Sequence, residues 1–541
     1  MKRYILLPLL ALAFTAQAQD SYMNERITNS SNDVIGTSRY VGMGGALGAL
    51  GADMSVISWN PAGIGLYRKN DIALTMGGLW GKSHISEENR GKFTFDQIGL
   101  VYNIKTGGET CPYINFAFNY QKKKNFNYNF YADNPDLHEL SQMDQLAELT
   151  DWDTGKQSNL AGMALVNGYF LPQTLKDNLG NPVLDEEGNP VKYQKNVKSS
   201  LNNEYTHHSE GSLQSFDFNL STNINDRAFV GLTVGVDAMH YRGWTWYREY
   251  DFLDGKARYD LNNDIRITGT GVNVKLGTII RPIEDNPFRF GFVVETPTWY
   301  RLKNSTLFDL QREPNNLGSK IEPWENVDLD GNLFRFNVRS PWKVRTSIGS
   351  TVGSTFAWDV DYEFAAYAGM GMGYPRDIYA DGSTTGNVKD KAMNEFTREN
   401  LRGTHTLRAG VEVNATKNLA FRLGYNLCTS AYKKNIGFDQ YYLNSAAMDC
   451  ATSTCYMRPG ATNILTLGMG YHTKSFYVDL AYKLRNQKAD FYAFDTNFTN
   501  TNQDEIPQFV WDNPALADVK LDPVGVDLTR QTITCTLGFK F

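Results

Sequence analysis

The chain has 541 residues and a formal net charge of −6, and this mild acidic excess does not suggest a nucleic-acid partner. Aromatic residues reach 13% and glycines number 47. The mean hydropathy of −0.42 excludes a protein built mainly from apolar membrane-spanning helices.

The first element is an apolar run over residues 4–14 that follows Lys2 and Arg3. It is too short to span a bilayer, and it precedes the small-x-small sequence Ala16-Gln17-Ala18. We therefore expect residues 1–18 to be a secretory signal peptide. In an exported chain, Cys450 and Cys455 enclose four residues and could form a small disulfide, whereas no cysteine–histidine spacing suggests zinc.

A stretch rich in glycine follows, over residues 39–66. Gly42, Gly44, Gly45, Gly48 and Gly51 remove side chains where the backbone must pack closely or turn. Asp53 is a candidate cap for a short helix over 54–59, which must end before Pro61. An apolar element of this size is too short to be a domain, so it needs a host to pack into.

From residue 70 onward, runs of about ten residues alternate apolar and polar side chains, which is the signature of a membrane β-barrel. Fourteen candidate strands follow this pattern: 71–80, 94–104, 112–128, 211–225, 227–247, 264–281, 287–302, 334–352, 355–367, 403–415, 418–429, 461–473, 475–487 and 529–541.

The connections between these strands alternate in length. Short connections lie at 105–111, 226, 282–286, 353–354, 416–417 and 474, and long ones at 81–93, 129–210, 248–263, 303–333, 368–402, 430–460 and 488–528. Antiparallel neighbours place alternate connections at opposite ends of a barrel, so one end has turns and the other has loops. A soluble β-sandwich or propeller, the alternative, does not predict this segregation.

Each strand also has one apolar face. In the last strand Ile533, Cys535, Leu537 and Phe539 share a face opposite Thr532, Thr534 and Thr536. A charge facing lipid at mid-depth would cost about 2–4 kcal/mol, so a membrane requires this separation. The fold class predicted is all-β, a transmembrane antiparallel barrel of about fourteen strands.

Two motifs in the glycine-rich stretch carry a family resemblance. Gly42-Met43-Gly44-Gly45-Ala46, followed by Trp59-Asn60-Pro61-Ala62-Gly63, resembles the amino-terminal hatch of the FadL/TodX family of outer-membrane transporters of long-chain fatty acids and hydrophobic compounds. Strand phrases such as Leu467-Gly468-Met469-Gly470-Tyr471 are also similar to that family. The resemblance implies a hatch over 19–69 inside the lumen of a barrel over 70–541, with Gly42, Gly44, Gly45, Asn60 and Pro61 as hatch residues.

It also implies a location in the cell outer membrane of a Gram-negative bacterium, with outer-membrane lipid as a partner. The chain ends on Phe541, which resembles the assembly signal that outer-membrane proteins present to their assembly machinery.

The longest loop contains an apolar segment, residues 160–171, in otherwise polar surroundings. An exposed apolar patch of this size usually marks a binding groove or a membrane contact. In the family, an extracellular groove captures substrate first. The candidate ligand-binding residues are Leu160, Met163, Leu165, Val166, Tyr169, Phe170 and Leu171. The alternative, that this segment only packs the loop onto itself, has equal weight.

Catalytic patterns are weak. The seven histidines are scattered, and neither a GxSxG elbow nor an HExxH motif occurs. A Ser/His pair meeting across strands stays open, and His207-His208 could hold a metal, although such a pair in a polar loop is more often solvated. We expect no enzyme activity, no catalytic residues, no metal and no cofactor.

The sequence therefore favours an outer-membrane channel for passive uptake of a hydrophobic small-molecule ligand, fatty-acid-like or aromatic. The alternative is a structural or adhesive surface barrel that binds a partner through its long loops. A general polar porin is a third possibility, but an open pore needs no hatch.

Overall fold

We analysed a computed structural model of the chain. It describes residues 33–81, 91–138, 140–148, 158–166, 170–174, 181, 192–196, 200–251, 257–312, 333–379, 383–434, 445, 452–494 and 521–541. The predicted signal peptide lies outside these residues, as does Cys450 of the predicted disulfide.

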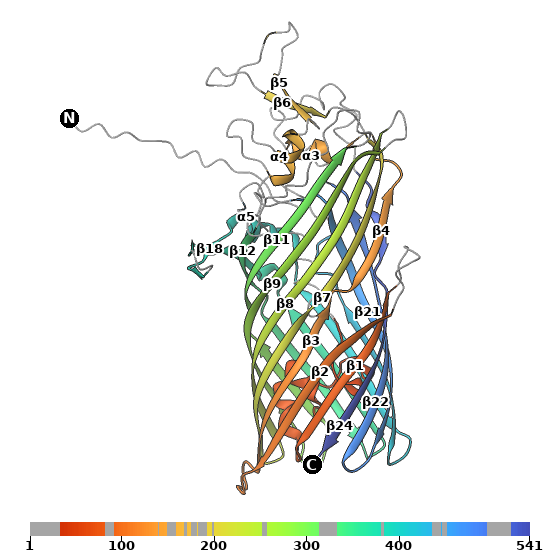
Figure 1. The fold of residues 1–541 in the computed structure, drawn as a ribbon. Coiled ribbons are helices and arrows are strands. Elements are labelled where there is room, and N and C mark those ends of the chain that lie inside the picture. Colours follow the sequence, from red (N-terminus) through yellow and green to blue (C-terminus); the bar gives the residue numbers. More distant parts are fainter. Residues whose placement is uncertain are drawn as a thin grey trace, which may run out of the picture.

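The chain forms one closed antiparallel barrel of 14 strands (Figure 1). The wall closes because β1 pairs with β2 on one side and with the last strand, β24, on the other. In order, the wall contains β1 (Asp71–Gly81), β2 (Lys92–Lys105), β3 (Tyr113–Asn125) continued by β4 (Tyr128–Asn134), β7 (Ser200–Ile224), β8 (Ala228–Asp251), β9 (Ala257–Ile280), β10 (Arg289–Glu295) continued by β11 (Trp299–Arg312), β12 (Leu333–Arg339) continued by β13 (Lys343–Val352), β14 (Phe356–Ala365) with β15 (Gly371–Tyr374), β18 (Val388–Lys389) with β19 (Thr404–Asn414), β20 (Leu419–Cys428), β21 (Tyr456–His472), β22 (Phe476–Tyr492), and β23 (Val524–Asp527) continued by β24 (Arg530–Lys540).

The predicted barrel is confirmed, but three wall strands are longer than predicted. β7, β8 and β9 contain 25, 24 and 24 residues, more than the roughly 9–11 that cross a bilayer. Residues 200–210 belong to β7 and residues 129–134 to β4, so the predicted loop 129–210 is too long at both ends. β8 extends to Asp251 and β9 begins at Ala257, so the predicted loop 248–263 is also too long at both ends. Beyond the apolar band the pattern of β9 is reversed: Leu261, Ile265 and Ile267 are buried on the inner face, and the polar Asp264 and Arg266 face outward.

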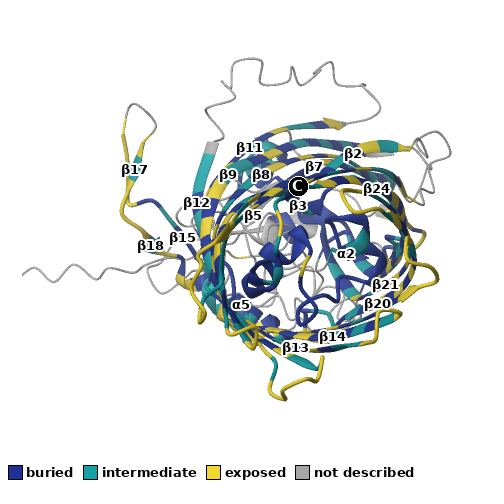
Figure 2. Cartoon of the chain, turned by 90° about the horizontal axis from the view of Figure 1, so that it is seen from below, coloured by how far each residue is buried: buried dark blue, intermediate teal, exposed yellow. Residues whose placement is uncertain are grey.

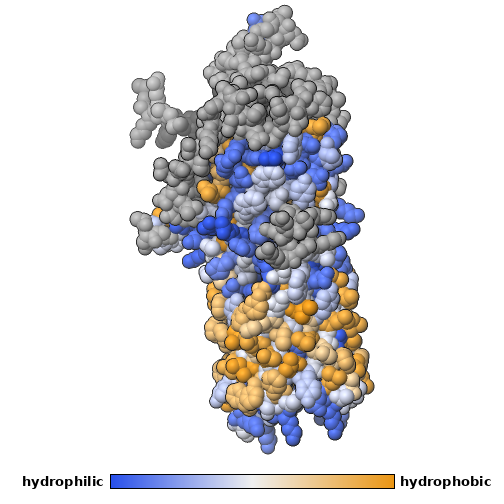
Figure 3. Space-filling model, turned by 45° about the vertical axis from the view of Figure 1, so that its right-hand side comes forward, coloured by the Kyte–Doolittle hydropathy of each residue, from blue (hydrophilic) through white to orange (hydrophobic). Residues whose placement is uncertain are grey.

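The outer surface has an apolar band near the end with the short turns, which we call the short-turn end; the opposite end is the long-loop end (Figures 1 and 3). Leu467, Leu537 and Phe539 are about half exposed on this band. Their neighbours Thr466 and Thr536 are fully buried on the inner face. Above the band the surface is mainly hydrophilic, so the spanning region covers only part of the barrel height (Figure 3).

Residues 33–69 lie inside the barrel, and we keep the name hatch for them (Figures 1 and 2). They contain α2 (Ser38–Gly42) and the 3₁₀ helices η2 (Met54–Ser58) and η3 (Pro61–Leu66). Viewed along the axis from the short-turn end, these elements fill much of the lumen (Figure 2). The domain boundaries at residues 18 and 69 stay a prediction.

The long-loop end carries the remaining described elements. They are α3 (Gln142–Glu148), α4 (Asn159–Val166), the hairpin β5 (Phe170–Thr174) with β6 (Lys192–Asn196), η4 (Tyr367–Gly369), the hairpin β16 (Asp377–Ile378) with β17 (Thr384–Thr385), and α5 (Lys391–Asn400). No helix in the described part of the chain is long and apolar enough to cross a membrane.

Candidate functional site

The hatch is stabilised first by its own caps. Thr37 accepts a hydrogen bond from the backbone N–H of Tyr40 at the start of α2, and Asp53 accepts one from Ser55 at the start of η2. The Thr37 hydroxyl also donates to Asp53 at 2.7 Å, which joins the two caps. Asp53 therefore caps residues 54–58 as the sequence predicts, in a 3₁₀ helix that ends before Pro61.

Asn60 and Pro61 start the last hatch helix. The Asn60 side chain accepts a hydrogen bond from Ala62 N–H, and Pro61 occupies the first turn, where it loses no helical hydrogen bond. The Asn60 amide also donates to the Gly48 carbonyl at 2.7 Å. These two residues thus fold the hatch back on itself.

Close packing between the hatch and the wall depends on glycine. Gly44 has φ +66°, and a side chain there would lie 2.7 Å from the backbone nitrogen of Tyr425. On the facing strand, a Cβ at Gly424 would lie 2.1 Å from the nitrogen of Gly44. The two backbones therefore contact each other directly, and neither position has room for a larger residue.

Two buried aspartates of β14 bind the middle of the hatch. Asp359 accepts hydrogen bonds from the backbone N–H groups of Ala49 and Leu50, at 3.0 and 2.7 Å. Asp361 accepts from Gly48 N–H at 3.2 Å and from the indole N–H of Trp59 at 2.7 Å. Because this part of the hatch is not helical, its N–H groups need acceptors from elsewhere, and the wall supplies them.

Two arginines also contact the Trp59 ring. The guanidinium carbons of Arg408 and Arg345 lie 3.5 and 4.3 Å from the ring centroid, which is cation–π geometry. Arg345 is paired in turn with Glu295 and Glu363, and Arg408 donates to the Tyr40 hydroxyl at 2.6 Å. Trp59, which belongs to the predicted hatch motif, is therefore held by charged side chains of the wall.

Ion pairs bind the first part of the hatch to two sides of the barrel. Asp33 contacts Lys483 at 2.7 Å and Arg530 at 3.3 Å. Arg39 contacts Glu412 at 3.0 Å. Removing one partner of such a buried pair leaves an uncompensated charge, so these contacts favour one hatch position.

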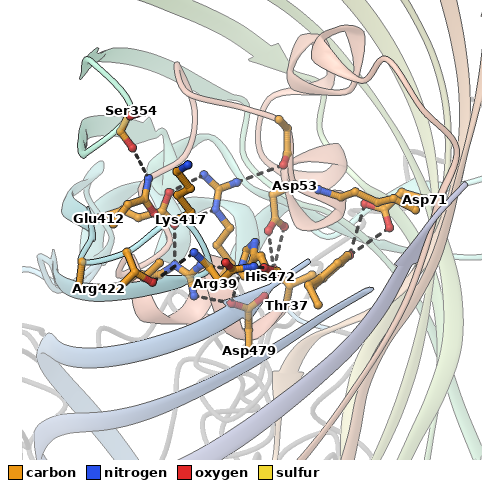
Figure 4. A pocket seen from close by; sticks show the side chains of 18 of the residues that line it. Thr37, Arg39, Asp53, Asp71, Ser354, Glu412, Lys417, Arg422, His472 and Asp479 are labelled. Atoms are coloured by element: carbon orange, nitrogen blue, oxygen red, sulfur yellow. Dashed lines mark hydrogen bonds and ion pairs between the residues drawn. The ribbon is translucent and has the colours of Figure 1, made fainter. Parts of the chain in front are cut away.

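A cavity of about 780 Å³ lies between the hatch and the short-turn end (Figure 4). Its lining is polar, and it contains a chain of ion pairs in which Arg422 contacts Glu412 at 2.6 Å and Asp479 at 2.5 Å; His472 is hydrogen-bonded to Asp479 at 3.0 Å. We call this cavity the vestibule. Its charged lining suits water and ions better than an apolar solute.

Above the hatch, toward the long-loop end, the inner face of the wall becomes apolar. We call the apolar residues there the lumenal cluster: Tyr241, Ile265, Ile267, Tyr300, Leu302, Phe336, Val338, Met372, Met393 and Phe396. Met393 and Phe396 belong to α5. The others belong to wall strands, where they alternate with outward polar residues. The sequence analysis missed these residues. The available signal was a pair of strands, 264–281 and 287–302, with apolar residues on both faces.

Between the lumenal cluster and the hatch lies a cavity of about 70 Å³, lined by Tyr40, Trp59, Tyr300, Tyr367 and Arg408 among others. Ligand pockets usually have about 300–1,000 Å³. This cavity is therefore smaller than the sites that usually hold small-molecule ligands.

A second apolar cluster, the mouth cluster, lies nearer the long-loop end. It joins α3 and α4 to the inner wall through Phe130, Tyr205, Tyr247, Leu261, Leu310 and Phe491. Of the predicted ligand residues, Leu160 is buried in this cluster, and Met163 and Leu165 pack against it while partly buried. The side chains of Val166, Phe170 and Leu171 and all of Tyr169 lie outside the described residues. Leu160 thus packs internally, and the binding role of the others stays a prediction.

The metal site considered at His207-His208 is not supported by the contacts of the described residues. Within the described ranges, no group of three or more His, Cys, Asp or Glu side chains could hold a metal ion. His207 is buried and stacked on Phe130, with ring centroids 4.8 Å apart. It thus lies within an apolar environment rather than in a solvated loop.

The wall pairing has a gap on the long-loop side of β2 and β3. Their ladder extends from Lys105↔Tyr113 only to Gln97↔Gln121, although β2 begins at Lys92. A bulge at Lys123 accompanies the gap and directs its ammonium to Asp237 at 2.7 Å. Phe93 and Ile98 are exposed beside the gap, which therefore faces the upper part of the apolar band.

The fold and these contacts define an outer-membrane-type β-barrel whose lumen contains its own N-terminal segment. No protein-family model and no curated protein matches the chain. Similar solved structures include a FadL homologue of Pseudomonas aeruginosa (12% identity, 98% of this chain and 100% of that chain, TM-score 0.49) and the toluene transporter TbuX of Ralstonia pickettii (12%, 94% and 100%, 0.44). The toluene transporter TodX of P. putida is also similar (9%, 94% and 99%, 0.42).

At this identity and these TM-scores, we base the functional inference on the geometry of this chain alone.

The contact between Gly44 and Gly424 provides a test of the hatch. Replacing Gly424→Val should displace the hatch, because the new side chain overlaps the Gly44 backbone, while the wall still closes. Single-channel conductance in planar bilayers should rise above that of the unaltered chain. The matched control is Gly525→Val, where an added Cβ meets nothing within 4 Å. Unchanged conductance of Gly424→Val, with heat-modifiable gel mobility retained, would contradict a plug held at this contact.

Proposed function

We propose that this protein is an outer-membrane channel for passive uptake of hydrophobic small molecules, and that the described conformation is its closed state. The observation that carries the proposal is the lumenal cluster. A general polar porin has a polar inner surface along its whole length. Here the inner face carries an apolar cluster between the hatch and the long-loop end. An apolar solute gains about 25 cal/mol for each Å² of its surface removed from water, so this zone favours it over a polar one.

The order of the zones gives a route. A solute enters at the mouth cluster, crosses to the lumenal cluster, and then meets the hatch. Met372 and Met393 belong to the lumenal cluster, and methionine side chains adapt to irregular shapes, so this cluster can open around a solute without a change in the wall. A ligand that binds better when the hatch is shifted would favour that state, which is how binding opens the route.

We propose that the solute then leaves through the gap between β2 and β3 into the membrane. The alternative path leads through the vestibule, whose lining is charged. Lipid is the better solvent for an apolar solute, so exit at the apolar band avoids the desolvation of that charged lining.

The lumenal cluster can be tested with paired substitutions. Met372→Gln with Met393→Gln should weaken binding of cis-parinaric acid to the purified barrel by about tenfold, because each change places an amide in the apolar zone. Fluorescence titration measures the affinity. The matched control is Met469→Gln, which is 44% exposed on the outer band. Equal affinities for the inner and outer variants would remove the lumenal cluster from the proposal.

The predicted capture segment is tested separately. Leu165→Ser with Phe170→Ser should weaken binding of the same probe about tenfold, because both changes remove apolar contacts whose free energy offsets the cost of association. The heat-modifiable mobility of the barrel on gels should stay unchanged. If these residues only pack the loop, the changes instead increase protease cleavage and leave affinity unaltered. That result would favour the alternative function, a structural or adhesive barrel, for this loop.

A further inference from the structure

The outer wall changes character sharply where β8, β9, β11 and β12 leave the apolar band. On β9 the outward residues Leu276 and Val272 are about half exposed, and the next outward charge is Arg266. On β11 the exposed Trp299 is followed at the next two outward positions by Arg301 and Lys303. Each strand therefore presents cations within a few residues of the lipid-facing surface.

Five cationic side chains gather there, and we call them the basic wall patch: Arg242, Arg266, Arg301, Lys303 and Arg335. The pairing brings them together, because Arg301 is opposite Thr270 and Lys303 opposite Thr268 on β9. Four neighbouring strands at about 4.8 Å spacing make the patch roughly 15 Å wide. A surface of this size matches a headgroup that carries two separated anions better than a single small ion.

Within the basic wall patch, side chains of like charge lie directly opposite each other on neighbouring strands. Arg242 lies directly opposite Arg266 on one neighbouring strand and opposite Glu210 on the other, and Lys303 is the direct partner of Arg335. Like charges in these positions destabilise a sheet unless a counter-ion is present. Asp264 supplies one for the first pair, at 2.7 Å from Arg242 and 3.5 Å from Arg266. Among the described residues, no acidic side chain is paired with Arg301, Lys303 or Arg335.

Elsewhere on the wall, cations are fewer at the edge of the band. On β24, β21 and β19 the outward residues there are Gln531, Asn463 and His405, and on β22 Asn486 is followed outward by the exposed Lys488. The larger group of cations on β8, β9, β11 and β12 favours an anionic partner on this side of the barrel.

We propose that the basic wall patch binds the phosphate groups of a phosphorylated glycolipid in the leaflet facing the long-loop end. This inference rests on the proposed outer-membrane location. Arginine binds phosphate through paired N–H donors, and lysine adds a point charge. The apolar band directly below accepts the acyl chains of the same lipid, so charge complementarity and continuity with the membrane-facing surface favour a lipid over a soluble anion.

The test uses the full chain purified in detergent, with bisphosphorylated lipid A as the probe and native mass spectrometry as the readout. Arg301→Gln, Lys303→Gln and Arg335→Gln together should raise the dissociation constant about tenfold, in line with the loss of phosphate contacts. The control carries Lys105→Gln, Arg227→Gln and Lys474→Gln, three exposed cations at the short-turn end, and should bind as the unaltered chain does. A second variant, Arg301→Lys with Arg335→Lys, keeps the charge and should retain most of the affinity.

Two further measurements separate the outcomes. Dephosphorylated lipid A should bind weakly to every variant, and inorganic phosphate should not compete. Equal binding of phosphorylated and dephosphorylated lipid, or an unchanged dissociation constant in the triple Gln variant, would overturn the proposal. Parinaric acid binding should be the same in all these variants. A failure of the lipid-binding proposal is therefore distinguishable from a failure of the proposed channel function.

Discussion

A peptide segment inside a barrel must find partners for its backbone polar groups, and this requirement shapes the hatch and the wall together. Most of the hatch is not regular helix or strand, so N–H groups such as those of Gly48, Ala49 and Leu50 need acceptors on the wall. Asp359 and Asp361 provide them. Placing two carboxylates in a buried site is costly unless they are hydrogen-bonded, so the hatch stabilises the wall in return.

The same constraint separates the lumen into zones. Where the hatch is present, the inner face carries charges that bind it; above the hatch, the inner face is apolar and contains the lumenal cluster. The small cavity between the two zones contains Trp59 and Arg408, which belong to the hatch anchor. In the proposed function, a solute that reaches this point would contact the anchor itself, which would couple ligand binding to the hatch position.

Much of the fold is predictable because a membrane imposes a simple rule. Leu537 and Thr536 differ in burial because one faces lipid and the other the lumen, and this alternation identifies the strands. The hatch motif is also predictable, since Gly44, Asn60 and Pro61 have local roles. The apolar lumenal residues are not, because Ile265 or Leu302 reads as an ordinary strand residue until the pairing shows which face it occupies. The extensions of β7 to β9 beyond the band were missed for the same reason.

The central claim is that hydrophobic solutes occupy the lumenal cluster. The most direct measurement is photo-crosslinking of the reconstituted barrel with a diazirine-bearing fatty acid, followed by peptide mapping. The account predicts labelled peptides that contain Phe336, Met372 or Met393, with labelling reduced by an excess of unmodified fatty acid. Labelling confined to outward residues such as Leu467 and Leu480, and insensitive to competition, would contradict it.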